Sequence, residues 1–156
     1  MDMLKTSVAC LFGCILFAVI GSSSGYAATS GKEQANRQLV TEFYDMAFNQ
    51  RKPAEAAEKY LSKQYTQHNP FVADGPKPFV DFFVAYQKKH PEAHVDIKRK
   101  IAEGDYVVLH VQSQEKPKES GRAVIDIFRV TDGKITEHWD VGQPIPAKPA
   151  NQNTMF

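Results

Sequence analysis

Acidic and histidine side chains gather near the carboxyl-terminal end of the sequence, on two alternating stretches that flank an Asp132-Gly133 pair. Such a pair between alternating stretches predicts a β-hairpin. The candidate catalytic residues on its arms are Asp126, His138 and Asp140. Carboxylates and imidazoles are the groups that most often move protons in enzymes, so this hairpin indicates acid–base chemistry. Because such groups on a strand face are more often solvated than catalytic, the interpretation needs support elsewhere in the chain.

The hairpin register decides whether these side chains meet. A two-residue turn at Asp132-Gly133 would pair Asp126 with Trp139, on the face away from His138. A three-residue loop over residues 131–133, with Gly133 as a bulge, would instead pair Asp126 with His138. We favour this loop because it separates a polar face from an apolar one. The polar face would carry Val124, Asp126, Phe128, Thr136, His138 and Asp140, and the apolar face Ile125, Ile127, Ile135, Trp139 and Val141.

Further polar candidates lie upstream. His68 and Asn69 precede Pro70, which disfavours helix at Asn69 and makes this segment extended or irregular. Their donors suit a substrate oxygen, with turn support and surface exposure as the alternative. His110, on a predicted strand, is a candidate substrate contact. The candidate apolar contacts are Tyr44, Phe83 and Phe128.

The elements that would position these residues follow from periodicity. Apolar residues at three-and-four spacing predict an amphipathic helix over residues 31–48, proline at a first turn predicts a second over 53–60, and an aromatic stripe predicts a third over 79–90. Alternation then predicts strands over residues 94–102, 106–115, 123–130 and 135–142.

Three helices followed by consecutive strands predict an α+β domain over residues 29–143. We expect the helices to pack on the concave face of a strongly curved, mostly antiparallel four-stranded sheet, leaving an apolar cavity at its mouth. His68, His110, Asp126, His138 and Asp140 are expected to converge there. Residues 144–156, with three prolines and few apolar residues, predict a flexible tail.

Composition narrows the functional classes. The 156 residues carry a formal net charge of +1 and no basic run interleaved with aromatics, which disfavours nucleic-acid binding. Lys5 followed by the apolar run Val8 to Ile20 and a small, polar stretch predicts a signal peptide over residues 1–28, with cleavage after Ala27 or Ala28. Both cysteines lie inside it, so the exported chain would have no disulfide and no thiolate metal site.

Three segments carry a family resemblance. Residues 65–70 (YTQHNP) followed by Gly75, residues 103–110 (EGDYVVLH) and residues 126–140 (DIFRVTDGKITEHWD) resemble the SnoaL-like polyketide cyclases of the nuclear transport factor 2-like superfamily. The resemblance spans about residues 33–143. It implies a cone of three helices and a bent sheet around an apolar cavity, frequently a homodimer through the outer sheet face. Cyclases of this family use an aspartate as acid and base, without metal or cofactor.

The resemblance and the residues together predict a cofactor-free acid–base enzyme of the aldol cyclase, isomerase or dehydratase type, acting on a small carbonyl compound. Asp140 is the first choice for the base. Asp126 is either the runner-up or the partner that orients His138, and His68 with Asn69 would bind the substrate oxygen. An exported, non-catalytic binding module is the alternative. A metal site on His138 and Asp140, with His68 or His110 as a third ligand, is a weaker alternative because no recognised ligand spacing supports it.

Overall fold

The computed structural model describes residues 30–156, so the predicted signal peptide lies outside the described residues. The elements in chain order are α1 (Gly31–Tyr44), the π-helical η1 (Asp45–Asn49), α2 (Pro53–Tyr60), β1 (Leu61–Gln67), α3 (Pro76–Lys89), β2 (His94–Glu103), β3 (Tyr106–Gln114), β4 (Arg122–Thr131) and β5 (Lys134–Pro144). Helices precede the main run of strands, as predicted, and the α+β class is confirmed.

The sheet has five strands in the order β1-β5-β4-β3-β2, not four. The unexpected strand, β1, pairs in parallel with β5, whereas the other pairs are antiparallel. Only Leu61 and Tyr65 of β1 are buried, so the segment lacks the apolar alternation by which the other strands were recognised.

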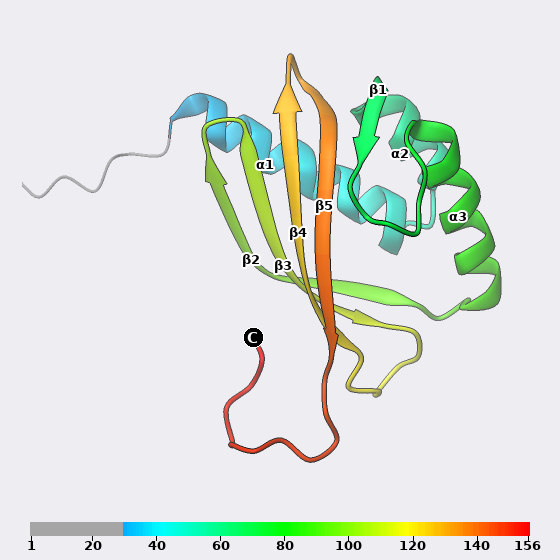
Figure 1. The fold of residues 1–156 in the computed structure, drawn as a ribbon, viewed down its shortest axis with the longest axis vertical. Coiled ribbons are helices and arrows are strands. Elements are labelled where there is room, and N and C mark those ends of the chain that lie inside the picture. Colours follow the sequence, from blue (N-terminus) through cyan, green and yellow to red (C-terminus); the bar gives the residue numbers. More distant parts are fainter. Residues whose placement is uncertain (1–29) are drawn as a thin grey trace, which may run out of the picture.

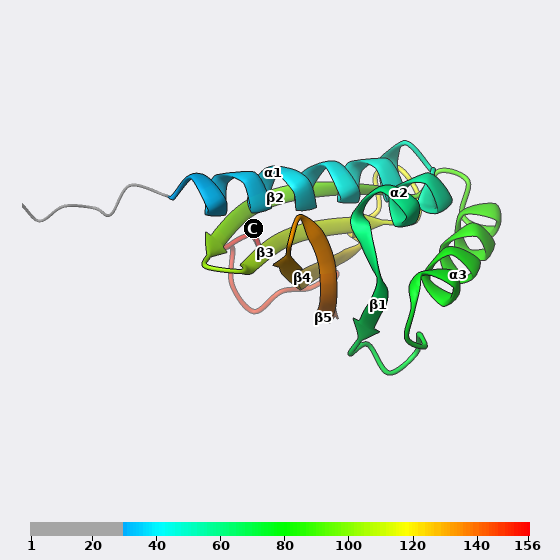
Figure 2. The same cartoon turned by 90° about the horizontal axis from the view of Figure 1, so that it is seen from above.

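The helices cover one side of the sheet. Figure 1 and Figure 2 show α1 lying along the sheet, with α2 and α3 next to β1. We call α1 and η1 together the first helical segment. The core between these layers is formed mainly by Val40, Phe43 and Ala47 of this segment, Val107, Leu109 and Val111 of β3, and Phe128 and Val130 of β4. Burial of this apolar surface is the main force that holds the helices on the sheet.

Both ends of the first helical segment are fixed by side chains. The Ser30 hydroxyl accepts from the Glu33 amide at 3.2 Å, and the Glu33 carboxylate accepts from the Ser30 amide at 2.9 Å, a capping box. At the other end, Asn49 exchanges two 3.1 Å hydrogen bonds with the backbone of Val95 in β2. These contacts fix the helix against the strand that forms the far edge of the sheet.

Two bulges shape the antiparallel part of the sheet. Ile97 of β2 pairs with Val111 and Arg99 pairs with His110, so Lys98 is an extra residue, and Figure 1 shows the strand bending strongly along its length. In β5, Ile135 pairs with Val130 and Glu137 pairs with Arg129, which leaves Thr136 as the extra residue. The second bulge determines which side chains of β5 face the helices.

The predicted hairpin loop was wrong in detail. The turn has two residues, Asp132 and Gly133, both with positive φ, and the extra residue lies within β5 instead of the turn. Asp126 therefore pairs with Asp140, and Phe128 pairs with His138.

The predicted polar face is confirmed for Val124, Asp126, Phe128, His138 and Asp140, which all line one cavity, because a bulge anywhere in the arm restores the alternation. Thr136 is not part of this face, because it is the extra residue and contacts Thr131 and Arg129. A second exception is Ile135, which we placed on the outer face. It precedes the bulge, faces the helices opposite Val130 and is fully buried.

The carboxyl-terminal segment returns to the outer face of the sheet. The Phe156 ring lies 5.2 Å from the His110 ring, and the Lys98 ammonium lies 5.3 Å from the centre of the Phe156 ring. The predicted flexibility of residues 144–156 stays a prediction. Within residues 30–156, no helix is both long and apolar enough to cross a membrane.

Candidate active site

A cavity of about 220 Å³ lies between α1, α3 and the inner face of the sheet. Its aromatic lining comes from Phe43, Tyr44 and Phe48 near the end of the first helical segment, Tyr65 of β1, Phe79, Phe82, Phe83 and Tyr86 of α3, and Phe128 of β4. Of these, Tyr44, Phe83 and Phe128 were predicted as ligand contacts. The polar residues Gln67, Asn69, Asp126, His138 and Asp140 meet on the strand side of the cavity.

Asp126 and His138 form a buried pair. Asp126 is 5% exposed and His138 is 8% exposed, and the distance between Asp126 Oδ1 and His138 Nε2 is 3.0 Å. The Tyr44 hydroxyl donates to the other oxygen, Asp126 Oδ2, at 2.9 Å. Both oxygens of Asp126 are thus engaged, which leaves this carboxylate poorly placed to take a proton from a ligand.

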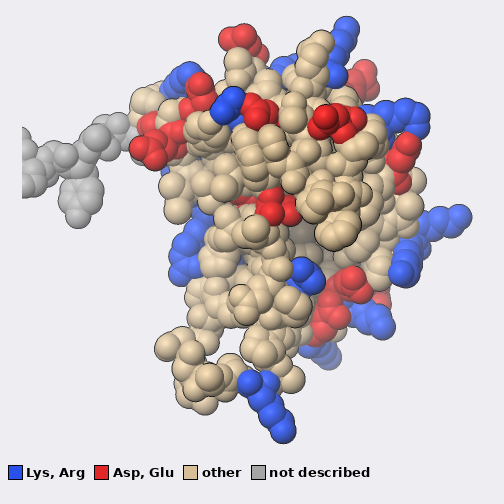
Figure 3. Space-filling view, viewed as in Figure 1, with Lys and Arg blue, Asp and Glu red and all other residues tan. Residues whose placement is uncertain are grey.

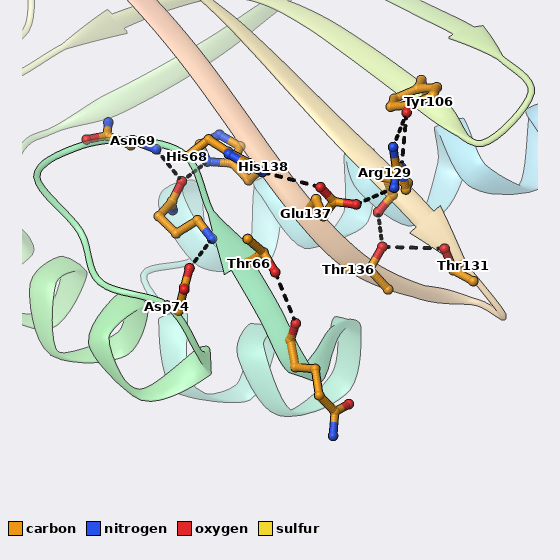
Figure 4. Close-up of polar contacts among 12 residues, drawn as sticks. Thr66, His68, Asn69, Asp74, Tyr106, Arg129, Thr131, Thr136, Glu137 and His138 are labelled. Carbon is orange, nitrogen blue, oxygen red and sulfur yellow. Dashed lines mark hydrogen bonds and ion pairs between the residues drawn. The ribbon is translucent and has the colours of Figure 1, made fainter.

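The protonation of His138 follows from Gln67. The Gln67 Oε1 atom accepts the Asn69 backbone amide at 3.0 Å, which identifies it as the amide oxygen, and His138 Nδ1 lies 2.8 Å from the same atom. His138 Nδ1 must therefore carry a proton. The Gln67 backbone amide is itself held by Asp74 at 2.7 Å, a contact drawn in Figure 4.

Because Nδ1 is protonated, one further proton lies between His138 Nε2 and Asp126 Oδ1. It belongs either to an imidazolium facing a carboxylate or to a neutral carboxyl facing a neutral imidazole. In both forms the pair has no net charge and holds one exchangeable proton.

Asp140 differs from Asp126 in its partners. The Asn69 side-chain amide donates to both Asp140 oxygens, at 2.9 Å and 2.7 Å, and within residues 30–156 no cationic group pairs with this carboxylate. Asp140 is half-buried and lines the cavity. It is therefore the carboxylate with lone pairs available to a ligand, held in place by a neutral amide.

Tyr44 keeps its proton at neutral pH. Burial raises the pKa of Tyr44 well above its ordinary value, and the negative charge of Asp126 raises this pKa further. Tyr44 is thus a permanent donor that orients Asp126.

The cavity lining contains no lysine and no arginine among the described residues. Figure 3 shows acidic and basic side chains interspersed around the face seen there, with a mostly uncharged, hollowed centre. A ligand that carries a carboxylate or phosphate would find no lysine or arginine partner in the described lining.

A cation could be held by Asp126, His138 and Asp140, whose ligand atoms lie within 4.8 Å of one another. Binding would require His138 Nε2 to give up its hydrogen bond to Asp126, because that nitrogen is the only one not committed to Gln67. The three candidate metal ligands are therefore Asp126, His138 and Asp140, with Asp126 as the third ligand in place of His68 or His110.

His68 does not join this group, which corrects our expectation. Its ring stacks on Trp139 at 4.4 Å, and its Nε2 lies 3.2 Å from a Glu137 oxygen. Glu137 also binds Arg129, which contacts the Tyr106 hydroxyl, as Figure 4 shows. Glu137 and Trp139 alternate with His138, so a side chain that binds them lies on the outer face of the sheet.

His110 is also outside the cavity. It alternates with the buried Leu109 and Val111 of β3, so it faces outward, where its Nδ1 lies 3.1 Å from Arg99 and its ring packs on Phe156. We had expected His110 to reach the cavity, although alternation with Leu109 and Val111 places it on the opposite face of its strand.

The sequence reasoning missed Gln67 and Tyr65. Tyr65 is 2% exposed, and its hydroxyl oxygen accepts from Gln67 Nε2 at 3.2 Å. The two residues are separated by one position in β1 and therefore share a face of the strand. Recognition of residues 61–67 as a strand would have identified both.

The chain matches the family model of the SnoaL-like polyketide cyclases over residues 38–149. No curated protein sequence matches it significantly.

Similar solved structures include a proposed polyketide cyclase of Bacillus cereus (24% identity, TM-score 0.60, covering 72% of this chain and 78% of that one). Others are the TsrD protein of Streptomyces laurentii (22%, TM-score 0.57, 70% and 89%) and a proposed ketosteroid isomerase of Kribbella flavida (18%, TM-score 0.61, 77% and 86%). At these identities the likeness establishes the shared fold.

Proposed function

Because this chain belongs to the SnoaL-like polyketide cyclase family, we propose that it is a cofactor-free acid–base enzyme that removes a proton from carbon beside the carbonyl group of a small, largely apolar compound. The observation that carries this proposal is the contrast between the two aspartates. Asp126 is engaged on both oxygens by Tyr44 and His138, whereas Asp140 faces the same cavity with only a neutral amide as its partner.

The first step assigns a role to each group. An Asp140 oxygen takes the proton of the substrate C–H bond, and the electron pair of that bond moves to give an enolate, whose negative charge lies mainly on the former carbonyl oxygen. Asn69 holds the Asp140 carboxylate in position, through hydrogen bonds of 2.9 Å and 2.7 Å. The Asp126–His138 pair lies beside it and adds no net charge to the site.

The fate of the enolate distinguishes three reaction types. Attack of its carbon on a second carbonyl of the same molecule forms a C–C bond, as in an aldol closure, and the alkoxide that results takes the proton back from Asp140. Return of the proton from Asp140 to a different carbon gives an isomerase. Loss of a β-hydroxyl, which takes the proton from Asp140 and leaves as water, gives a dehydratase. All three begin with the same proton transfer, so a test of that transfer addresses the class as a whole.

Two properties of the cavity limit the substrate. Its volume of about 220 Å³ lies below the range of roughly 300–1,000 Å³ that is common for ligand sites, which favours a compound of one or two rings over a large polycycle. Its aromatic lining, without lysine or arginine among the described residues, favours an uncharged compound.

Hydrogen–deuterium exchange at the carbon beside a carbonyl tests the first step without knowledge of the natural substrate. Acetophenone and cyclohexanone would be incubated with the protein in D₂O, and loss of the signal of the protons on the carbon beside the carbonyl followed by NMR. We expect wild-type protein to accelerate exchange, and Asp140→Asn to lower the rate by a factor of about 10² or more because the base is lost. Asp81→Asn, at an exposed position of α3, is the matched control.

The alternative function is a non-catalytic binding module, favoured by the small aromatic cavity itself. In that case the same ketones would bind without any exchange above the buffer rate, and Asp140→Asn would leave their affinity unchanged. Acceleration that disappears in Asp140→Asn while the affinity is kept would exclude this alternative.

A metal-dependent reaction makes a different prediction from ours. We expect dialysis against a chelator to leave the exchange rate unchanged, because His138 is held by Gln67 and Asp126 in its protonated form. Elemental analysis that found one zinc per chain, together with loss of exchange on its removal, would overturn the cofactor-free proposal.

We also propose that the protein is exported after removal of its first 27 or 28 residues. The support is the charged start, apolar run and small-residue stretch of the sequence. The intact mass of protein recovered from a bacterial periplasm should lack those residues. Full-length mass in the cytosolic fraction would contradict export.

A further inference from the structure

The Tyr65 hydroxyl is a buried donor that faces the cavity without an acceptor. Its oxygen accepts a hydrogen bond from Gln67 Nε2 at 3.2 Å, and within residues 30–156 no group accepts its own proton. Gln67 cannot do so, because its oxygen is directed at the Asn69 amide and at His138. A buried donor left unpaired costs about 1–3 kcal/mol, so an acceptor supplied by a ligand would be stabilising.

The other donors near the carboxylates are already used. The Tyr44 hydroxyl donates to Asp126, and the Asn69 side chain donates to Asp140. Both nitrogens of His138 are directed at Gln67 and Asp126. The proposed enolate needs a donor for its oxygen, and within this group the Tyr65 hydroxyl remains, together with the second N–H of the Gln67 side chain.

Tyr65 keeps its proton under the conditions in which the enzyme would work. Burial raises the pKa of Tyr65, and the negative charges of Asp126 and Asp140 raise it further, against a smaller lowering by the Gln67 hydrogen bond. The hydroxyl therefore remains a neutral donor at neutral pH, close enough to both carboxylates for their charges to act on it.

We propose that Tyr65 donates a hydrogen bond from its hydroxyl to the carbonyl oxygen of the ligand and stabilises the negative charge that develops there. This assignment rests on the proposed function, and it gives Tyr65 the role that the sequence had suggested for His68. The ligand oxygen then lies next to β1, and the carbon that loses its proton lies toward Asp140.

This arrangement selects a substrate class. A neutral hydroxyl donor, with no lysine or arginine in the described lining, suits an oxygen that is uncharged on binding and becomes negative only during proton transfer. Ketones and aldehydes meet that requirement, whereas carboxylates and phosphate esters are charged before the reaction begins.

Binding of an oxyanion mimic tests Tyr65 separately from turnover. The parent is Asp140→Asn, in which an uncharged side chain stands in for the protonated base. The probes are 4-nitrophenolate, whose oxygen resembles the enolate, and 4-nitrotoluene, which has the same shape without that oxygen. Affinities are measured by calorimetry at a pH at which the phenolate is ionised.

Adding Tyr65→Phe to this parent should weaken 4-nitrophenolate binding by about 10- to 100-fold, the effect of a hydrogen bond to a charged group, and leave 4-nitrotoluene binding unchanged. The matched control is Tyr60→Phe, which removes a hydroxyl that donates to Glu42 outside the cavity lining. This control should change neither affinity.

Three results would overturn the assignment: no phenolate binding to the Asp140→Asn parent, equal affinity with and without the Tyr65 hydroxyl, or the same loss for both probes. The exchange assay is independent of these measurements. A Tyr65 effect on phenolate binding, without any exchange in wild-type protein, would keep the donor and reject the enzyme. Exchange in wild-type protein, without a Tyr65 effect on phenolate binding, would keep the enzyme and reject the donor.

Discussion

The side chain of Gln67 determines the state of the buried Asp126–His138 pair. Its oxygen accepts from Asn69 and from His138 Nδ1, and its nitrogen donates to Tyr65. A single amide thus directs both the imidazole and the tyrosine of the candidate site. We expect its replacement to affect both of them.

Gln67→Met keeps the length of the side chain and removes its hydrogen bonds. The free energy of unfolding should fall by about 1–3 kcal/mol, because the Nδ1 proton of His138 loses its acceptor inside the protein. Urea denaturation measures this change, and exchange of acetophenone should slow in the same variant. Gln38→Met, which removes an exposed contact to Glu42 on α1, is the control and should change stability by less than about 0.5 kcal/mol. Equal effects of the two substitutions would contradict the role of Gln67.

The raised pKa values of Tyr44 and Tyr65 predict how stability depends on pH. In the unfolded chain these tyrosines lose their protons near pH 10, whereas the folded protein retains them to higher pH. The folded state then binds more protons above about pH 10. The contribution of these two tyrosines to stability is therefore fully present below about pH 10 and is lost above it, by about 1.4 kcal/mol per pH unit for each tyrosine.

Urea denaturation between pH 9 and 11 measures this slope. Tyr65→Phe should make the slope shallower by the contribution of one tyrosine. An unchanged slope would show that the folded state does not hold the Tyr65 proton more tightly than the unfolded chain does.

At the scale of residues, the sequence located the acidic part of the site more reliably than its histidines. Alternation placed His138 and Asp140 on one strand face, since side-chain direction in a strand depends on parity. The separation of a polar face from an apolar one then placed Asp126 with them, although the bulge that this requires lies within β5 and not in the turn. His68 lies in an irregular segment, in which alternation does not determine the direction of a side chain.

The two outer-face contacts, His68 on Trp139 and His110 on Phe156, depend on long-range packing. Local sequence does not encode such packing.

At the scale of elements, local signals predicted the helices and four of the five strands. The second helix was predicted with the bounds that it has, Pro53–Tyr60, because a proline at its first position marks its start. The strand β1 could not be recognised because its pairing partner, β5, lies about 70 residues further along the chain. The position of the β5 bulge could not be predicted either, because a bulge in the turn and a bulge in the strand give the same alternation of the residues that follow.

The connection from β3 to β4 is predicted to depend on a glycine. Gly121 has φ of +74°, and a Cβ atom there would lie 2.1 Å from the Ser113 carbonyl oxygen. Gly121→Ala should therefore destabilise the protein by more than about 2 kcal/mol. Gly104→Ala, at φ of +56° with open space around the new atom, isolates the backbone strain and should cost about 1 kcal/mol. Thermal unfolding of both variants measures the difference, and equal melting temperatures would contradict it.

At the scale of the whole molecule, the outer face of the sheet supports our proposal of a homodimer. Val141 is 70% exposed there, and Ile125, Ile127 and Trp139 of β4 and β5 are partly exposed. Exposed apolar side chains grouped on a sheet face are typical of an interface between subunits.

Val141→Glu should convert a dimer to a monomer in sedimentation experiments, because it places a charge in the centre of the apolar face. Val84→Glu, at a 51% exposed position of α3, is the control and should leave the oligomeric state unchanged. A wild-type protein that sediments as a monomer at tens of micromolar would contradict the proposal.

The extra residue Thr136 has a consequence for insertions and deletions in this strand. Ile135 before it and His138 after it both face the helices only because Thr136 is an extra residue in the pairing with β4. Deletion of Thr136 would force a choice: either Ile135 keeps its place inside the protein, or His138 and Asp140 keep theirs in the cavity. Relatives of this chain that lack one residue at this point should therefore have lost either the histidine–aspartate pair or the apolar anchor, which makes the length of this segment a marker for the chemistry.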